Sequence, residues 1–483
     1  MKSGSKRTSI KTSYLLYLIK SMSSLLFPVL TFAYTSRVLS VENIGKVDFS
    51  RSIVSYFTLF STLGIVTYGT REGAKVRDDR QKLSMLVKEL FFINAVTTIV
   101  TYTAFCLVLA FSAKLADYRG LLLISGLNIG FTSLGMEWLY NALEEYRYIT
   151  VRTILFQAAA FVLLLLCVKN REDVSAYAAI LVFSSVGSNI LNFVNAGKYV
   201  SIRTHDKLNI KRHIRPVLIF FSNTIAGNVY LTLDTSMVGL LSDNYSVGLY
   251  SAGNKMNRIC LSAISALSAV LLPRITYYLK KGDEKKYREL IKKCAECVMM
   301  LSCPIACGMA VLSKDVLLVF SGNEFAAASV CSGIMSLILI FIPVSTFLCN
   351  QILIPYGKEK YQLMSTILGA AANVTVNLLL IPVLDEIGAA VGTVISEFIV
   401  CSVLCIGAFK VMDYRFAVRN IWHYILAASV MSGSLYLIPQ TVPVIHVLTS
   451  FGIGAFIYFA VLILLKDEFV WYIIHSLLAL VQK

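Results

Sequence analysis

The chain has 483 residues, of which 57% are hydrophobic and 15% charged, and its mean hydropathy is +0.71. A water-soluble domain needs more polar surface than this composition supplies, so the sequence predicts an integral membrane protein. The net charge is +16. In a membrane protein such an excess of basic residues orients the chain in the membrane and interacts with anionic lipids. It needs no nucleic acid to explain it, so we expect no nucleic-acid partner.

Apolar stretches of bilayer length follow one another almost from end to end, about fourteen in all, which predicts an all-α polytopic membrane protein. The first six lie near residues 13–39, 47–70, 85–112, 120–142, 150–168 and 175–197. A second six lie near residues 216–241, 246–272, 291–312, 328–354, 361–383 and 387–409. Two more lie near residues 421–438 and 444–465. The amphipathic tail that follows carries Trp471 and Tyr472, which suit the membrane interface.

These stretches predict an N-terminal lobe, a C-terminal lobe and three smaller parts. The expected boundaries are 1–200 for the N-lobe, 201–215 for a cytoplasmic linker, 216–410 for the C-lobe, 411–466 for the last two helices and 467–483 for the tail. With the N-terminus in the cytoplasm, most of the 44 Lys and Arg residues fall on the cytoplasmic side, as the positive-inside rule requires. We expect both termini to be cytoplasmic. The first apolar run is too long for a cleavable signal peptide, so we expect it to be retained as a helix.

A short motif recurs after about 200 residues. Leu39-Ser40 is followed by Gly45, and Leu241-Ser242 is followed by Gly248. Because six helices separate the copies, both enter the membrane from the same side, which predicts two lobes related by a pseudo-two-fold axis along the membrane normal. The alternative is a chance similarity between two loops.

The eleven cysteines lie almost entirely in apolar helices and carry no disulfide signal. Cys294 with Cys297 and Cys401 with Cys405 lack the histidine or second cysteine pair that a metal site needs. We therefore expect no metal and no other cofactor. The chain also lacks a G-x-x-x-x-G-K-[ST] phosphate-binding loop, so we expect a secondary transporter and not an ATPase of that type.

Three basic residues, Lys20, Lys255 and Arg258, fall within predicted membrane helices. A charge at the bilayer centre costs roughly 2.5 to 3.5 kcal/mol unless it faces water or a partner. Lys255 and Arg258 are three residues apart and share one helix face, to which Asn254 and Asn257 add polar, sugar-facing groups.

Arg51 adds a further cation near the outer surface, about 7 Å below it at ~1.5 Å per residue. The first, second and eighth helices are thus expected to offer a cationic surface between the halves. A pyrophosphate linked to a lipid matches such a surface, because its oxygens accept from Lys and Arg donors while the lipid tail stays in the bilayer.

Attached sugars would need hydrogen-bond partners, since a hydroxyl stripped of water costs a few kcal/mol. Amides in apolar helices can supply such partners, although each alone is more often a helix-packing residue. The candidates are Asn128, Asn189, Asn192, Asn350, Asn373 and Asn377.

Structural alternatives exist for each of these cations except Arg258. Asp234 lies at nearly the depth of Lys255 and would neutralise it, Asp48 would pair with Arg51, and Lys20 is near enough to the inner surface to snorkel.

The deep acids Glu137 and Glu397, and with them Asp234, are candidates for binding a coupling proton or Na⁺. Polar roles in helix packing are the alternative.

Six stretches carry a resemblance to a known family: FPVLTFAYTSRVLSVENIGKVDFSRSIVSYF, GIVTYGTREGAKVRDDR, EWLYNALEEYRYITVRTI, LDTSMVGLLSDNYSVGLYSAGNKMNRI, QILIPYGKEKYQ and NLLLIPVLDEIGAAVGTVISE. In order and spacing the chain resembles the Wzx-type polysaccharide repeat-unit flippases, in the larger group that includes the lipid II flippase MurJ and the MATE drug exporters. The resemblance implies a twelve-helix core of two lobes, two extra helices, and alternating access that turns undecaprenyl-diphosphate-linked oligosaccharide outward. It assigns pyrophosphate binding to Arg51, Lys255 and Arg258, and less directly to Lys20 and Arg37.

The same resemblance implies a multi-pass protein of the bacterial cytoplasmic membrane that contacts membrane lipids. A polysaccharide polymerase or glycosyltransferases of the pathway are expected partners. The first helix offers fewer cations than the lipid II flippases have there, Lys20 and Arg37 only, which weighs against the peptidoglycan precursor as substrate. It offers no acid to hold cationic drugs, and a cationic cavity repels cations. A polymerase or membrane glycosyltransferase is the enzymatic alternative, disfavoured by the short loops and the absence of a D-x-D motif.

Overall fold

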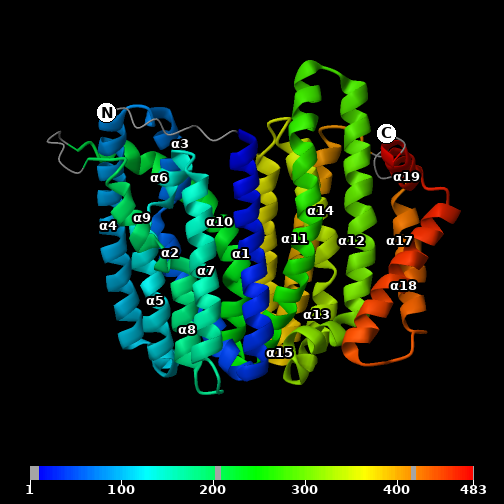
Figure 1. Cartoon of the computed structure of the whole chain (residues 1–483), viewed down its shortest axis with the longest axis horizontal. Coiled ribbons are helices and arrows are strands. Elements are labelled where there is room, and N and C mark those ends of the chain that lie inside the picture. Colours follow the sequence, from blue (N-terminus) through cyan, green and yellow to red (C-terminus); the bar gives the residue numbers. More distant parts are fainter. Residues whose placement is uncertain (1–9, 202–207, 415–419, 482–483) are drawn as a thin grey trace. The chain divides into compact units, whose positions relative to one another are not determined.

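The computed structural model describes residues 10–201, 208–414 and 420–481, which form helices and no strand. The chain divides into two compact units, Met1–Ser236 and Met237–Lys483 (Figure 1). In each unit long helices run roughly alongside one another.

The first unit contains six long or broken helical stretches and most of a seventh. Its elements are α1 (Ile10–Val38), α2 (Val41–Thr62), α3 (Ile65–Val76), α4 (Arg80–Phe111), the 3₁₀ turn η1 (Ala113–Tyr118), α5 (Arg119–Leu134), α6 (Glu137–Ala142), α7 (Tyr146–Cys167), α8 (Val174–Val182), the π-helical turn η2 (Phe183–Gly187), α9 (Asn189–Ala196) and α10 (Lys211–Leu241).

The second unit begins within the last turns of α10. Its elements are α11 (Asn244–Lys281), α12 (Glu284–Ser321), the 3₁₀ turn η3 (Asn323–Ala328), α13 (Ser329–Met335), α14 (Ile338–Phe347), the π-helical turn η4 (Leu348–Leu353), α15 (Lys360–Phe409), α17 (Ile421–Leu435), α18 (Pro443–Leu464) and α19 (Glu468–Val481).

The chain is a multi-pass membrane protein. Eight helical stretches of the described chain are long and apolar enough to cross a bilayer, or nine if the pair Asn323–Met335 and Ile338–Leu353, bent by 41°, forms one span. Large apolar side chains such as Phe111, Phe451 and Phe456 are exposed, as lipid-facing positions require. The fold class is therefore as predicted, whereas the number fourteen stays a prediction.

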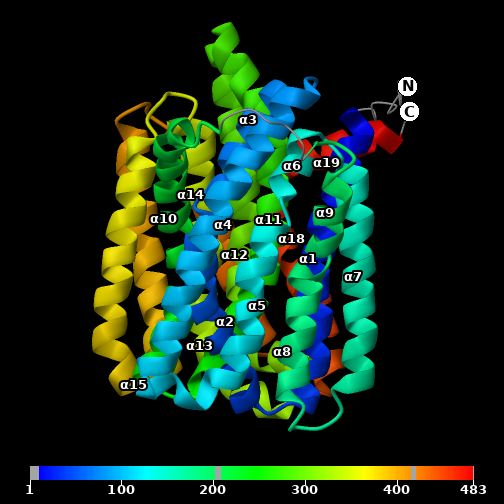
Figure 2. The ribbon, with the colours of Figure 1, turned by 90° about the vertical axis from the view of Figure 1, so that its left-hand side faces the viewer.

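The 50-residue helix α15 is a hairpin of two helices and not one long rod. As a straight helix it would measure about 75 Å, far beyond the ~30 Å hydrocarbon core of a bilayer. Its backbone leaves the helical region at Asp385, with φ 49° and ψ −127°. The limbs then pack closely, because a Cβ on Gly388 would lie 2.6 Å from the Leu380 carbonyl oxygen (Figure 2). This confirms the separate helices predicted at 361–383 and 387–409.

Two helices predicted to be continuous are broken. The predicted helix 47–70 is interrupted at Leu63 and Gly64, whose φ angles are 45° and 70°. A Cβ on Gly64 would meet the backbone nitrogen of Phe221 at 2.7 Å, so α10 passes directly against this break. The predicted helix 120–142 is interrupted at Gly135 and Met136. Hydropathy does not detect such breaks because the residues on both sides remain apolar.

One predicted helix is much longer than expected. The apolar run 291–312 lies inside α12, which spans Glu284–Ser321, and the α11–α12 hairpin rises beyond the other helices of its unit (Figure 1). Its polar end is stabilised by ion pairs one turn apart, including Glu284 with Arg288 and Glu289 with Lys293. A hydropathy pattern detects only the apolar part of a helix, so the polar end of α12 was not included in the predicted range.

The repeated motif has the same local structure in both units. Ser40 caps α2 by accepting from the backbone N–H of Asn43, and Asp243 accepts in the same way from Ser246. The same offset separates Ser40 from Asp243 and Gly45 from Gly248. Each unit also contains a six-residue 3₁₀ turn directly after a long helix, η1 after α4 and η3 after α12. These recurrences favour a duplicated architecture over chance similarity.

A buried carboxylate fastens the start of α10 to the first unit. Glu89 on α4 is fully buried and accepts from the Asn209 backbone N–H at 2.6 Å, from Arg212 at 2.5 Å and from His213 Nε2 at 2.8 Å. The other ring nitrogen of His213 lies 2.7 Å from the Tyr68 hydroxyl on α3. This network holds three helices together near one end of the unit.

We expect Glu89→Ala to lower the free energy of unfolding by about 3 kcal/mol or more, because it leaves a buried histidine and a backbone N–H without their acceptor. Denaturant unfolding of the purified protein measures this change. Glu284→Ala removes an acid from an exposed pair and is the control, with an expected loss below about 1 kcal/mol. Equal losses in the two variants would contradict the role assigned to Glu89.

Candidate functional site

Two of the predicted site residues meet in the first unit, although they were assigned different roles. The Lys20 ammonium on α1 forms an ion pair with the Glu137 carboxylate, the first residue of α6. Both side chains are partly exposed. Ser23 on the same helix donates to the Gln157 side chain of α7. Lys20 is therefore neutralised by an acid within its own unit, an arrangement not among the alternatives considered from sequence.

The break between α5 and α6 sets the position of Glu137. A Cβ on Gly135 would lie 2.5 Å from the Asn189 side chain, so the break admits no larger residue without movement. Asn189 donates to the Phe131 carbonyl at 3.0 Å and Asn192 to the Gly135 carbonyl at 2.7 Å. These two asparagines, candidates for sugar contacts from sequence, complete the backbone hydrogen bonding of the broken helix instead.

The other cations of the first unit lie toward its surface. Arg37, near the end of α1, is exposed and donates to the Ala33 carbonyl at 2.5 Å. Arg51 on α2 is exposed as well, while Asp48, one turn earlier, is buried.

In the second unit the predicted polar face of α11 divides into two parts. Asn254, Lys255 and Arg258 are half-buried, and Arg258 Nε donates to the Asn254 side-chain oxygen at 3.2 Å. Asn257 is fully buried and donates to the Gly253 and Ser332 carbonyls, both at 3.0 Å. Asn257 thus packs α11 against α13, whereas the other three side chains form the accessible part of the face.

Arg258 forms its described hydrogen bond with a neutral group. Its hydrogen-bond acceptor is an amide, and no carboxylate among the described residues of the second unit forms an ion pair with it. Arginine presents five N–H donors in a planar fork, so several remain to bind an anion. Such a guanidinium can bind the oxygens of a carboxylate or a phosphate group through two parallel hydrogen bonds.

The remaining acid candidates are buried in separate places. Asp234 lies on α10 in the first unit and Glu397 lies on the second limb of α15, and both side chains are less than a tenth exposed. Asp234 and Glu397 each interact with a neighbouring residue. No cluster of three or more His, Cys, Asp or Glu in the described residues is placed to hold a metal ion.

Sequence reasoning missed Arg152 on α7. Only 6% of its surface is exposed, and its Nε and Nη1 atoms have no hydrogen-bond partner among the described residues. The available signal was an arginine six residues inside an apolar helix.

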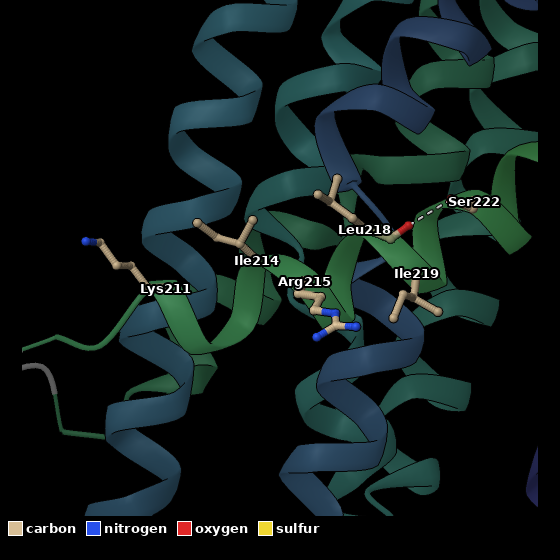
Figure 3. Close-up of a pocket in the computed structure, with 6 residues that line it drawn as sticks. All are labelled: Lys211, Ile214, Arg215, Leu218, Ile219 and Ser222. Carbon is tan, nitrogen blue, oxygen red and sulfur yellow. Dashed lines mark hydrogen bonds between the residues drawn. The ribbon is translucent and has the colours of Figure 1, made fainter.

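A shallow hollow of about 480 Å³ lies along one face of α10 (Figure 3). Lys211 and Arg215 stand at its basic end, and Ser222 donates to the Leu218 carbonyl at 3.0 Å. A single helix supplies every lining residue, so this hollow is an open surface with both basic and apolar side chains and not an enclosed site.

These features define a multi-pass helical membrane protein that carries charged side chains inside its apolar helices. The chain shares its fold with the lipid II flippase MurJ in an inward closed conformation, with a TM-score of 0.75 and 14% identity over 94% of this chain and 99% of that one. It belongs to the family described as Polysaccharide biosynthesis protein, whose model matches residues 11–279. The MatE family model matches residues 219–379.

Two curated relatives agree with this assignment. A putative O-antigen transporter of Shigella dysenteriae is 22% identical over 369 residues, which cover 75% of this chain and 91% of the relative. A putative O-antigen transporter of Escherichia coli K12 is 22% identical over 404 residues, covering 82% and 96%. The resemblance identified from the sequence motifs is thereby confirmed.

The Lys20–Glu137 pair is testable by a double-mutant cycle. We expect Lys20→Met and Glu137→Gln to be non-additive by about 1 kcal/mol in unfolding free energy, because either change alone removes the whole ion pair. Lys20→Met with Glu42→Gln is the control, since Glu42 pairs with Lys46, and it should be additive within about 0.5 kcal/mol. Additivity in both cycles would favour a snorkelling Lys20.

Proposed function

We propose that this protein is a flippase that moves undecaprenyl-diphosphate-linked oligosaccharide repeat units from the cytoplasmic to the outer leaflet. It acts by alternating access and supplies the synthesis of a surface polysaccharide, an O-antigen, capsule or exopolysaccharide. Family membership and two relatives named as O-antigen transporters support this proposal. The observation that carries it is the accessible cationic face of α11.

The chemistry of that face fits a diphosphate. Among the described residues, the Arg258 guanidinium is hydrogen-bonded only to an amide. Lys255 lies on the same side of the helix, one turn away. Charge-assisted hydrogen bonds of this kind contribute about 1.5–3 kcal/mol each. Once Arg258 turns to the diphosphate, the side-chain oxygen of Asn254 can accept a hydrogen bond from a sugar hydroxyl.

The other predicted cations take secondary places. Arg51 and Arg37 are exposed at the surface of the first unit. Lys20 is a weaker candidate for binding the diphosphate than the sequence indicated, because its charge is already compensated by Glu137. Binding of a diphosphate at Lys20 would have to displace that carboxylate.

Transport of an anionic headgroup outward is favoured by an inside-negative membrane potential, by roughly 2.3 kcal/mol per charge per 100 mV. The uphill step is then the return of the emptied protein. Protonation or Na⁺ binding at a buried acid would drive that return, and Glu397 is the first candidate because it lies in the same unit as the cationic face. Asp234 is the second.

The proposed location is the cytoplasmic membrane of a bacterium, with both termini in the cytoplasm. A polysaccharide polymerase and glycosyltransferases that make the repeat unit are proposed as transient partners. Membrane lipids surround the exposed apolar faces.

The cationic face is tested by transport of a labelled undecaprenyl-diphosphate oligosaccharide in proteoliposomes. We expect Arg258→Ala and Lys255→Ala each to slow transport about tenfold or more, since a lost charge-assisted bond of 1.5–3 kcal/mol corresponds to at least that factor. Arg288→Ala alters an exposed pair on α12 and should leave transport unchanged.

Full activity in both α11 variants would show that this face is structural. If the wild type transports none of these lipids, lipid II included, the enzyme and drug-exporter alternatives have to be considered again.

Ion coupling is tested with Glu397→Gln. We expect this variant to lose the dependence of transport on a proton or Na⁺ gradient, because a glutamine can neither be protonated at neutral pH nor hold the cation by charge. Asp234→Asn, tested in parallel, separates the two acids. Unchanged gradient dependence in Glu397→Gln would remove Glu397 from the coupling mechanism.

A further inference from the structure

A second hollow lies on the first unit and involves none of the residues assigned above to substrate. It has a volume of about 480 Å³ and is lined by the first turns of α7 together with Leu191 of α9. Its polar lining consists of Arg147, Arg152 and Glu145, and its wall continues along Val151 and Leu155. Both of those apolar side chains are exposed, as is Leu191.

Arg152 is the informative residue of this hollow. It is more than nine-tenths buried, yet its Nε and Nη1 atoms have no acceptor among the described residues. Its guanidinium carbon lies 5.9 Å from the centre of the Tyr148 ring. A buried guanidinium normally has an acceptor for each donor, because a charged group left unpaired away from water is costly.

The neighbouring acceptors bond to other groups. Glu137 acts on Arg152 electrostatically, but it forms its ion pair with Lys20. The Tyr140 hydroxyl, on α6, donates to the Asn192 carbonyl and receives the Asn195 amide. Arg152 lines the hollow, so a ligand that enters the hollow can supply an acceptor for these two donors.

We propose that this α7–α9 groove binds a membrane glycerophospholipid, with its phosphodiester on Arg152 and Arg147 and an acyl chain along Val151, Leu155 and Leu191. The position fits the depth of a headgroup that sinks slightly into the membrane. Arg152 lies six residues after the start of α7, about 9 Å along the helix axis. A phosphodiester drawn to that depth meets the cation while its tail stays in hydrocarbon.

Charge and size favour a phospholipid over the proposed cargo. Arg147, Arg152 and Glu145 together carry one net positive charge, which matches the single negative charge of a phosphodiester and falls short of a diphosphate. The volume of about 480 Å³ suits a phosphate and its glycerol unit. The bound lipid would thus be a structural ligand of the first unit and not a transport substrate.

Native mass spectrometry of the delipidated full-length protein tests this proposal. Phosphatidylglycerol, phosphatidylethanolamine and undecaprenyl diphosphate are titrated separately into the wild type and each variant. We expect Arg152→Gln to weaken binding of the first phospholipid about tenfold or more, and Arg152→Lys to retain part of it. Leu191→Trp, which fills the apolar wall at an exposed position, should weaken binding without touching the arginine.

Arg215→Gln is the matched control, because it removes a guanidinium from α10, outside this groove, and should change affinity by less than twofold. Wild-type phospholipid affinity in both Arg152→Gln and Leu191→Trp would overturn the proposal. So would a loss of undecaprenyl diphosphate binding with phospholipid binding intact, since the groove would then take the cargo. If Arg152→Gln does not fold, Leu191→Trp alone decides. The assay needs no transport, so its outcome is independent of the proposed function.

Discussion

In the hydrocarbon of a bilayer, each backbone N–H and C=O that a helix break releases must find a partner within the protein. The break between α5 and α6 shows how this chain meets the requirement. Asn189 and Asn192, from the neighbouring α8–α9 stretch, donate to the carbonyls of Phe131 and Gly135. The broken helix can then present Glu137 at a place that a straight helix would not reach. The position of the Lys20 pair depends on two amides more than on any charge.

The charged residues inside the apolar helices fall into two groups, those that pair with one another and those that form no ion pair. Lys20 and Glu137, or Glu89 with His213 and Arg212, satisfy one another and hold helices in place. Arg152 and Arg258 form no ion pair with a carboxylate in the described part of their own units. A paired charge stabilises the native arrangement, whereas an unpaired one stores a free-energy cost that a ligand can recover. The second group is therefore where ligands are expected.

Sequence patterns predicted most of the helices, because twenty apolar residues in a row have few alternatives. The breaks at Leu63 and at Gly135 were missed, since the residues there are as apolar as their neighbours and the cause lies in another helix. Lys255 and Arg258 were found because a cation in an apolar run is rare. Arg152 escaped notice because it lies only two residues after the start of the predicted helix 150–168, where an arginine is expected at the membrane surface. The pairing of Lys20 with Glu137 spans 117 residues and is visible only in three dimensions.

The long α11–α12 hairpin has the geometry of a lever arm. A helix of 38 residues measures about 57 Å, of which a bilayer core covers ~30 Å. A tilt of about 10° in α11 would displace its far end by roughly 10 Å, by the same geometry. That end turns at Gly282, whose φ of 74° permits the tight reversal into α12. Small movements of the segment that carries Lys255 and Arg258 are thus magnified at the hairpin tip, which makes the tip a natural position for a distance label.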